Sequence, residues 1–195
     1  NVIKYKSDNF EVSGLSTSSN VGILRKQIKE FKPLYVCVRE KKHAVILKKS
    51  LKPEIKIFSG DDGLLAMIAD LEIDRFVLAI SGSAALLPLL KIIDSGKDVA
   101  LANKEALVMA GPIIMERARR KNVKLIPVDS EQSAIWQCLE GQDYSKIRCI
   151  YLTASGGPFR KFAKAKLCGI SVKQALKHPR WKMGKRITVD SASLM

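Results

Sequence analysis

Two carboxylates stand one residue apart in the segment Asp129-Ser130-Glu131. The segment directly follows residues 124–128, a mostly apolar run that predicts a strand. Carboxylate oxygens are preferred ligands of hard divalent cations such as Mg²⁺ and Mn²⁺. The same residues would also suit a helix start, because Asp or Ser is favoured as an N-cap and Glu in the first turn. The pattern therefore indicates either a metal site that needs a further ligand or a capped helix.

A lysine occupies the equivalent place after another predicted strand. Lys104 lies in Asn103-Lys104-Glu105, directly after the run 99–102. A cation at the end of a strand can neutralise a phosphate or a developing oxyanion. A surface lysine in the first turn of a helix is the alternative.

A third polar cluster combines a hydroxyl with glycines. Ser155 begins Ser155-Gly156-Gly157-Pro158, which follows the predicted strand 147–153. Glycines without side chains let backbone amides approach an anion closely. A plain turn would have the same composition.

An aromatic and a histidine lie in the basic loop HPRWKMGKR, residues 178–186. Trp181 suits a lid that excludes water from a bound substrate, or an anchor packed on the domain. His178 suits donation to a phosphate or acid–base work, or a cap at a helix end.

Short apolar runs alternate with amphipathic helical stretches over most of the chain, which predicts an α/β fold with a doubly wound parallel sheet. In such a sheet ligands bind beyond the carboxyl ends of the strands, so the three polar clusters indicate a site at one edge. Charge balance and periodicity shift near residue 143. We therefore expect two domains, residues 1–143 and 144–195. The expected strands are 10–16, 34–38, 55–58, 76–80, 99–102, 124–128 and 147–153, and the expected helices 21–31, 40–50, 61–71, 84–95, 103–121, 131–139 and 171–177.

The composition of the chain limits the class of protein and the kinds of ligand that it suits. The 195 residues are 47% hydrophobic and 27% charged, which argues against disorder. Four cysteines without CxxC spacing suit reduced thiols in a cytosolic protein. The formal charge of +15 is concentrated in residues 144–189, which contain no acidic residue. Such a segment suits phosphate-bearing ligands, nucleic acid, or a solvated basic face.

No G-x-G-x-x-G motif is present. If the sheet binds a dinucleotide, its first strand and glycine-rich turn are expected upstream of residue 1.

Four segments together resemble successive signatures of the 1-deoxy-D-xylulose 5-phosphate reductoisomerase family, in order and spacing. They are ALANKEALV (100–108), LIPVDSEQSAIWQCLEG (125–141), LTASGGPFR (152–160) and HPRWKMGKRITVDSASLM (178–195). The resemblance implies conversion of 1-deoxy-D-xylulose 5-phosphate to 2-C-methyl-D-erythritol 4-phosphate, with NADPH and Mn²⁺ or Mg²⁺, or also Co²⁺. It implies a Rossmann-like NADPH-binding domain without its first strand, followed by the first part of an α+β catalytic domain with a lid loop.

The resemblance also assigns roles to individual residues. Asp129 and Glu131 match metal ligands, and Lys104 and Glu131 are the expected catalytic residues. The substrate-contacting set and the cofactor-contacting set are larger. Substrate contacts are expected from Lys104, Ser130, Glu131, Ser155, His178, Trp181 and Ser191, and cofactor contacts from Ser18, Ser19, Asn20, Asn103, Glu105, Met183 and Gly184.

The chain departs from the family pattern at a few positions. Gln132 and Ser133 stand where the family commonly has His-Asn, Ala85 where glycine is usual, and Ser19 where a basic residue is frequent. A third metal-ligand Glu is expected directly after Met195. We expect the 195 residues alone to have little activity, and the full-length protein to be a homodimer without nucleic-acid or membrane partners. The expected location is the bacterial cytoplasm, or the plastid stroma in a eukaryote.

Two alternatives remain. One is a related NAD(P)-dependent dehydrogenase of another phosphorylated substrate. The other is a basic nucleic-acid-binding module centred on residues 144–189, although no recognised nucleic-acid-binding motif accompanies the charge.

Overall fold

The computed structural model describes residues 2–6, 8–153 and 156–193. The chain divides into two compact units, Asn1–Glu140 and Gly141–Met195. Each unit is described by itself below. Among the described residues, no helix combines the length and the apolar composition needed to cross a membrane.

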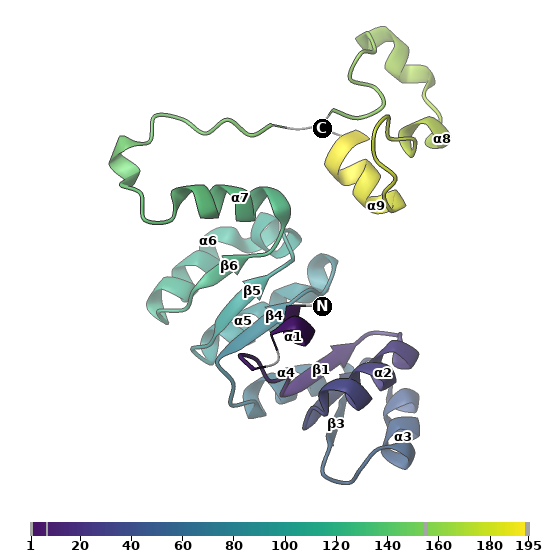
Figure 1. Cartoon of the computed structure of the whole chain (residues 1–195), viewed down its shortest axis with the longest axis vertical. Coiled ribbons are helices and arrows are strands. Elements are labelled where there is room, and N and C mark those ends of the chain that lie inside the picture. Colours follow the sequence, from purple (N-terminus) through teal and green to yellow (C-terminus); the bar gives the residue numbers. More distant parts are fainter. Residues whose placement is uncertain (1, 7, 154–155, 194–195) are drawn as a thin grey trace. The chain divides into compact units, whose positions relative to one another are not determined.

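Unit 1 contains six parallel strands in two three-stranded sheets (Figure 1). The first sheet has the order β1-β2-β3 and the second the order β4-β5-β6. All strand pairs are parallel, as the alternating sequence pattern predicted. The strands are β1 Gly14–Thr17, β2 Tyr35–Val38, β3 Lys56–Ser59, β4 Arg75–Leu78, β5 Asp98–Leu101 and β6 Leu125–Pro127.

Helices connect the parallel strands, because a parallel pair cannot be joined by a tight hairpin. Helix α2 shows why they form: its apolar residues recur at helical spacing, and Leu24 and Ile28 are buried while its polar face is exposed. A short helix, α1 Val2–Tyr5, precedes β1, and a 3-10 turn, Gly82–Ala85, precedes α5. The other helices of unit 1 are α2 Val21–Phe31, α3 Lys41–Ser50, α4 Gly60–Asp70, α5 Leu86–Asp94, α6 Glu105–Arg120 and α7 Ser130–Leu139.

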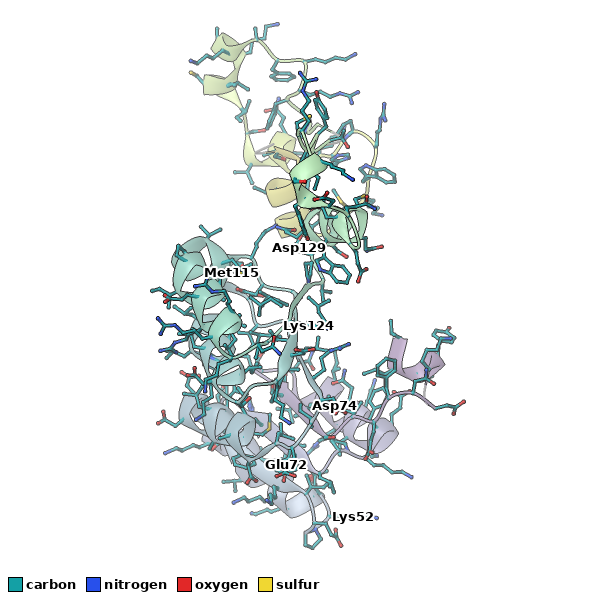
Figure 2. The ribbon with its side chains drawn as sticks, turned by 90° about the vertical axis from the view of Figure 1, so that its left-hand side faces the viewer. Lys52, Glu72, Asp74, Met115, Lys124 and Asp129 are labelled. Atoms are coloured by element: carbon teal, nitrogen blue, oxygen red, sulfur yellow. The ribbon has the colours of Figure 1, made fainter. Side chains whose placement is uncertain are left out.

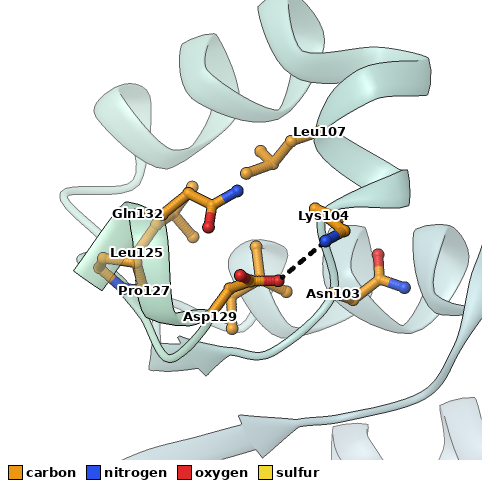
Figure 3. Close-up of a pocket in the computed structure, with 8 residues that line it drawn as sticks. Asn103, Lys104, Leu107, Leu125, Pro127, Asp129 and Gln132 are labelled. Atoms are coloured by element: carbon orange, nitrogen blue, oxygen red, sulfur yellow. Dashed lines mark ion pairs between the residues drawn. The ribbon is translucent and has the colours of Figure 1, made fainter. Parts of the chain in front are cut away.

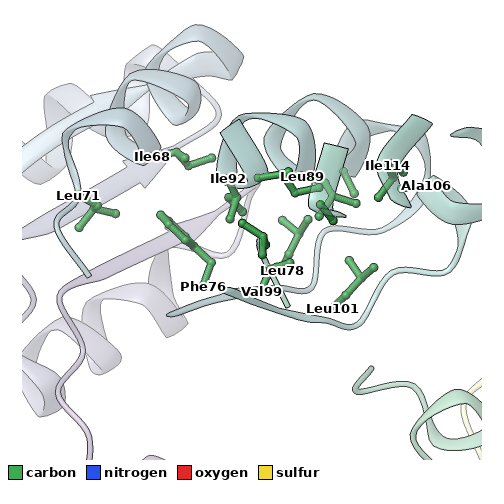
Figure 4. Close-up of a cluster of buried hydrophobic side chains, with 14 of the residues drawn as sticks. Ile68, Leu71, Phe76, Leu78, Leu89, Ile92, Val99, Leu101, Ala106 and Ile114 are labelled. Carbon is green, nitrogen blue, oxygen red and sulfur yellow. The ribbon is translucent and has the colours of Figure 1, made fainter. Parts of the chain in front are cut away.

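Two buried apolar clusters support the two sheets. The larger cluster combines β4 and β5 with α4, α5 and α6, and Figure 4 shows Phe76, Leu89 and Ile114 within it. The smaller cluster combines β1 and β2 with α2 and α3, and contains Val36 and Leu47. Helix α4 contacts both β2 and α5, so it joins the two halves of unit 1.

Helix α6 is kinked near its middle. Ala110 has non-helical backbone angles (φ −144°, ψ 28°), two residues before Pro112. Proline inside a helix removes one backbone donor and clashes with the preceding turn, which accounts for the kink. Val108 and Met109, on the N-terminal side of the kink, are exposed.

Unit 2 is built from short helical segments. They are the 3-10 turns Tyr144–Lys146 and Lys164–Gly169, α8 Val172–Ala175, α9 Lys185–Thr188 and the π-helical turn Val189–Ser193. Helix α8 falls inside the expected helix 171–177, and a capping box between Ser171 and Gln174 fixes its start.

The strand expected over residues 147–153 is wrong. These residues are described without regular structure, and Tyr151 is 87% exposed. A strand requires a neighbouring strand for its backbone hydrogen bonds, and the described part of unit 2 contains no strand. The segment has a composition that favours a strand, but no described strand of unit 2 is available to pair with it.

Candidate functional site

The order of the strands in the second sheet places Lys104 next to Asp129. Strands β5 and β6 are neighbours in parallel register, with Leu101 opposite Pro127. The residues that follow both strands therefore emerge at the same carboxyl edge. Figure 2 shows Asp129 at the opposite end of unit 1 from Glu72 and Asp74, which lie at the entrance to β4.

The two side chains form an ion pair. Lys104 Nζ lies 3.6 Å from Asp129 Oδ2, and both side chains are partly exposed (Figure 3). Asp129 occupies the N-cap position of α7, yet its side chain makes no capping hydrogen bond. Asp129 therefore stands at the capping position without capping the helix through its side chain, and its role as a metal ligand stays a prediction.

A small hollow adjoins the ion pair. Its lining combines leucines of β5, β6 and α6 with a few polar side chains (Figure 3). The lining residues are Leu101, Asn103, Lys104, Leu107, Leu125, Pro127, Asp129 and Gln132. A largely apolar lining with a few polar groups is typical of a small-molecule site.

Glu131 lies in the first turn of α7, beside Asp129. Its carboxylate accepts a hydrogen bond from Ser130 Oγ at 2.8 Å. That hydrogen bond is the largest cause that lowers the pKa of Glu131, followed by a backbone hydrogen bond, with Asp129 and Lys104 contributing further. Glu131 is therefore held in the ionised form that a metal ligand requires.

Asn103 is buried beneath this edge and its hydrogen-bonding capacity is already used. Its Nδ2 group donates to the carbonyls of Ile80 (2.8 Å) and Gly82 (3.1 Å) and to Glu105 Oε2 (3.0 Å). Its Oδ1 accepts from the backbone N–H of Ala106 at 2.8 Å. Asn103 thus fixes the loop after β4 to the first turn of α6.

Glu105 takes part in the same network. The backbone N–H of Gly82 donates to Glu105 Oε1 at 3.3 Å. The expected contacts of Asn103 and Glu105 with a cofactor stay predictions. What the structure gives them is a role in shaping the loop that follows β4.

The expected contacts to the adenosine end of the cofactor begin at the end of β1. Ser18, Ser19 and Asn20 are exposed in the turn between β1 and α2. Asn20 is the N-cap of α2, and its Oδ1 accepts from the backbone N–H of Ile23 at 3.1 Å. These residues lie after a parallel strand, where dinucleotides bind in sheets of this kind.

In unit 2, His178 organises the loop that carries Trp181. Its Nδ1 accepts from the backbone N–H groups of Arg180 (3.1 Å) and Trp181 (2.8 Å). In the neutral ring the proton is therefore assigned to Nε2, which becomes the donor side. Trp181 itself is 59% exposed, and its expected role as a lid stays a prediction.

Two of the signature segments of unit 2 meet at Gly157. A β-carbon at Gly157 would lie 2.3 Å from the carbonyl oxygen of Ala192, so the two backbones touch. The segments that carry Ser155 and Ser191 are thereby brought together. Ser155 and the side chain of Ser191 lie outside the described residues.

The remaining predicted cofactor contacts, Met183 and Gly184, precede α9. Met183 is partly buried, and the Gly184 carbonyl accepts hydrogen bonds from both the backbone and the side chain of Thr188. These contacts fix the start of α9.

Comparison with known proteins decides the family. The family model described as 1-deoxy-D-xylulose 5-phosphate reductoisomerase matches residues 1–111, and the model of the C-terminal domain of the same family matches residues 125–195. The chain belongs to this family.

Individual relatives agree with the assignment. The reductoisomerase of Thermoanaerobacter sp. (strain X514) is 48% identical over 194 residues, and that of Thermodesulfovibrio yellowstonii is 45% identical. Each match covers all of this chain and about half of the relative, 50% and 51% respectively. The chain thus spans about half the length of the curated relatives it matches.

Solved structures of the family have the same fold. The reductoisomerase of Zymomonas mobilis in complex with NADPH has a TM-score of 0.87 at 33% identity, covering 99% of this chain and 50% of that one. A DOX-P reductoisomerase in complex with NADPH, fosmidomycin and magnesium has a TM-score of 0.83 at 32% identity, with the same coverage. The resemblance and the α/β fold class inferred from the sequence are confirmed.

The donor chemistry at the edge of the second sheet suits magnesium, which is bound in the solved DOX-P reductoisomerase structure. Asp129 and Glu131 offer ionised oxygens, the ligands that Mg²⁺ and Mn²⁺ prefer. Among residues 2–6, 8–153 and 156–193, no group of three or more metal-binding side chains occurs. The pair therefore needs at least one further ligand to complete a site.

One polar lining residue, Gln132, was not predicted as part of the site. Gln132 lies three residues after Asp129, which places both on the same face of the first turns of α7. That spacing was the available signal. In the sequence, Gln132 appeared only as a departure from the family pattern.

Proposed function

We propose that the full-length protein containing this chain is an NADPH- and divalent-metal-dependent enzyme that converts 1-deoxy-D-xylulose 5-phosphate to 2-C-methyl-D-erythritol 4-phosphate. The observation that carries the proposal is the pairing of Lys104 with Asp129, beside an ionised Glu131, at the carboxyl edge of a parallel sheet. This arrangement combines a cation with two hard oxygen ligands at the position where such sheets bind ligands.

The chain's own residues divide the work. Asp129 and Glu131 hold the divalent ion, and Lys104 Nζ binds a substrate oxygen and stabilises negative charge that develops on it. Ser130 contacts the substrate and keeps Glu131 ionised. His178, through Nε2, binds the substrate phosphate together with Ser155 and Ser191, and Trp181 excludes water.

When bound, the metal (Mn²⁺, Mg²⁺ or Co²⁺) acts as a Lewis acid and NADPH supplies a hydride. Ser18, Ser19 and Asn20 hold the adenosine end of the cofactor, and Met183 and Gly184 the nicotinamide end. In the domain assignment that goes with this function, residues 1–143 form the cofactor domain and 144–195 the start of the catalytic domain.

The proposal is tested by following NADPH oxidation in the full-length protein with 1-deoxy-D-xylulose 5-phosphate and Mn²⁺. We expect turnover in the wild type and a loss of at least about 100-fold in Asp129→Asn, the size of effect that follows loss of a metal or oxyanion contact. Mn²⁺ binding, measured by electron paramagnetic resonance, should weaken in the same variant.

A matched control is available on α5. Asp94 forms an exposed ion pair with Arg117 at 3.2 Å, away from the site, so Asp94→Asn removes the same charge without touching it. The control should keep wild-type turnover. Absence of turnover in the wild-type protein, or unchanged Mn²⁺ binding in Asp129→Asn, would refute the function.

Two properties of the whole protein belong to the same proposal. We expect a homodimer, which sedimentation of the full-length protein would establish or exclude. We also expect a cytoplasmic location in a bacterial host, which cell fractionation would test.

A further inference from the structure

The turn after β1 has an unusual charge composition for a site that binds a phosphorylated ribose. In dinucleotide-binding sheets an acid after the second strand favours the ribose 2′-hydroxyl of NADH, whereas a nearby arginine accommodates the 2′-phosphate of NADPH. Here Ser18, Ser19 and Asn20 follow β1, and none of them is charged. The turn neither repels a phosphate nor supplies a cation for it.

The neighbouring strand supplies the missing charge. Strands β1 and β2 are paired in parallel register with Thr17 opposite Val38, so Arg39 comes opposite Ser18. The backbone N–H of Arg39 donates to the carbonyl of Thr17 at 3.2 Å, which extends the pairing past the end of the strands. Neighbouring strands lie about 4.8 Å apart, well within the reach of an arginine side chain.

Arg39 is also available for a ligand. Its side chain is exposed, and within the described part of the chain it forms no ion pair with an acid. The adjacent acid, Glu40, forms its ion pair with Lys42 at 2.5 Å. Lys42 is the largest cause that lowers the pKa of Glu40, and Arg39 is the smallest. Lys41 and Lys42 follow at the start of α3, so the local balance around Arg39 is positive.

We infer that Arg39 is the cofactor-specificity residue of this protein: it binds the 2′-phosphate of NADPH in place of a cation in the turn 18–20. The inference rests on the proposed function, because it presumes that the adenosine ribose lies at the end of β1. Arginine suits the role because its planar fork of donors matches phosphate oxygens and stays charged at every physiological pH.

The test measures binding rather than turnover. Isothermal titration calorimetry on the full-length protein compares 2′,5′-ADP, which carries the 2′-phosphate, with 5′-AMP, which lacks it. Arg39→Gln should weaken the binding of 2′,5′-ADP about tenfold or more, because a charge-assisted contact to the phosphate is removed. The affinity for 5′-AMP should stay within about twofold of the wild-type value. Arg39→Lys should keep part of the preference.

The matched control lies on the helix that follows Arg39. Lys48→Gln removes one positive charge from the last turn of α3, roughly 10 Å along the helix axis from its first residue, Lys41. It should leave both ligands unchanged. The inference is overturned if Arg39→Gln lowers the affinity for both ligands equally, lowers neither affinity, or has the same effect as Lys48→Gln. If the wild-type protein turns over the substrate but does not prefer 2′,5′-ADP, the specificity inference alone fails; if the wild type has no turnover, the proposed function fails.

Discussion

Asn103 shows how one buried amide can determine the shape of a site. It is 2% exposed, and its side chain contacts the loop after β4, Glu105 and the backbone of Ala106. Removing the amide would leave several of these groups unsatisfied in the interior, and unsatisfied buried groups cost more than a hydrogen bond gains.

We therefore expect Asn103→Ala to lower the free energy of unfolding by about 2–3 kcal/mol. Chemical denaturation would measure the loss. Asn9→Ala, in an exposed stretch before β1, is the control and should stay within about 0.5 kcal/mol of wild type. Equal stability of the two variants would contradict the role of the network.

Glu131 leads to a prediction about pH. Its pKa lies below the ordinary value, chiefly because Ser130 donates a hydrogen bond to the carboxylate. The carboxylate therefore stays ionised at pH values where an ordinary glutamate takes up a proton, and this is lost only as the pH falls through the lowered pKa.

Ser130→Ala removes the largest cause of that shift, so the pKa of Glu131 rises towards its ordinary value. The pH at which Mn²⁺ binding is half lost should move upward in this variant, as followed by a titration of bound Mn²⁺ between about pH 3 and 7. Ser133→Ala, one turn further along α7, is the control and should keep the wild-type pH dependence. An unchanged midpoint in Ser130→Ala would show that the hydrogen bond does not hold Glu131 ionised.

At the scale of elements, Gly157 is the glycine of unit 2 that lies closest to other backbone atoms, those of the turn Val189–Ser193. A methyl group at Gly157 would meet the backbone of Ala192 and Ser193 rather than a side chain that can move aside. Gly157→Ala should therefore destabilise the unit by about 1–3 kcal/mol, the usual cost of overpacking a filled interior.

Limited proteolysis of the full-length protein should detect faster cleavage within residues 141–195 of Gly157→Ala. Gly169→Ala is the control, because no atom lies within 4 Å of its added β-carbon. If Gly157→Ala and Gly169→Ala resist proteolysis equally, the backbones at Gly157 and Ala192 can move apart without loss of stability.

The sequence predicted the elements of unit 1 because burial there is periodic. All six strands and the helices α2 to α7 lie within a few residues of their expected positions, although β1 begins at Gly14 rather than at Phe10. The prediction of a strand over 147–153 was wrong because residue composition indicates that a segment can form a strand, but not whether a neighbouring strand is present to pair with it. A β-favouring segment with no neighbouring strand stays irregular.

The site was predictable to the extent that it follows from strand order. Adjacent parallel strands place Lys104 and Asp129 at one edge, and the sequence pattern contained that information. The hydrogen bonds of Asn103 were not predictable, because they depend on where the loop after β4 lies in space.

At the scale of the molecule, unit 1 has two buried clusters of unequal size. Leu89 is fully buried in the larger and Leu47 in the smaller, so each leucine probes one cluster. Truncation of a buried leucine to alanine costs about 2–5 kcal/mol. Leu89→Ala should speed amide hydrogen exchange throughout unit 1, whereas Leu47→Ala should speed it mainly in β1, α2, β2 and α3. Uniform acceleration by both variants would show that unit 1 unfolds only as a whole.

Because the clusters are unequal, a bound nucleotide should change the local stability of one part of unit 1 more than that of the other. The turn 18–20 and Arg39 follow β1 and β2, the strands that pack on the smaller cluster. This cluster contains fewer buried apolar residues than the larger one. A ligand that binds there stabilises the part of unit 1 that has the smaller core. Its binding free energy adds to the free energy needed to unfold that part. Melting of β1 and β2 should then be delayed by the adenosine moiety at ligand concentrations that leave the melting of β4 and β5 nearly unchanged.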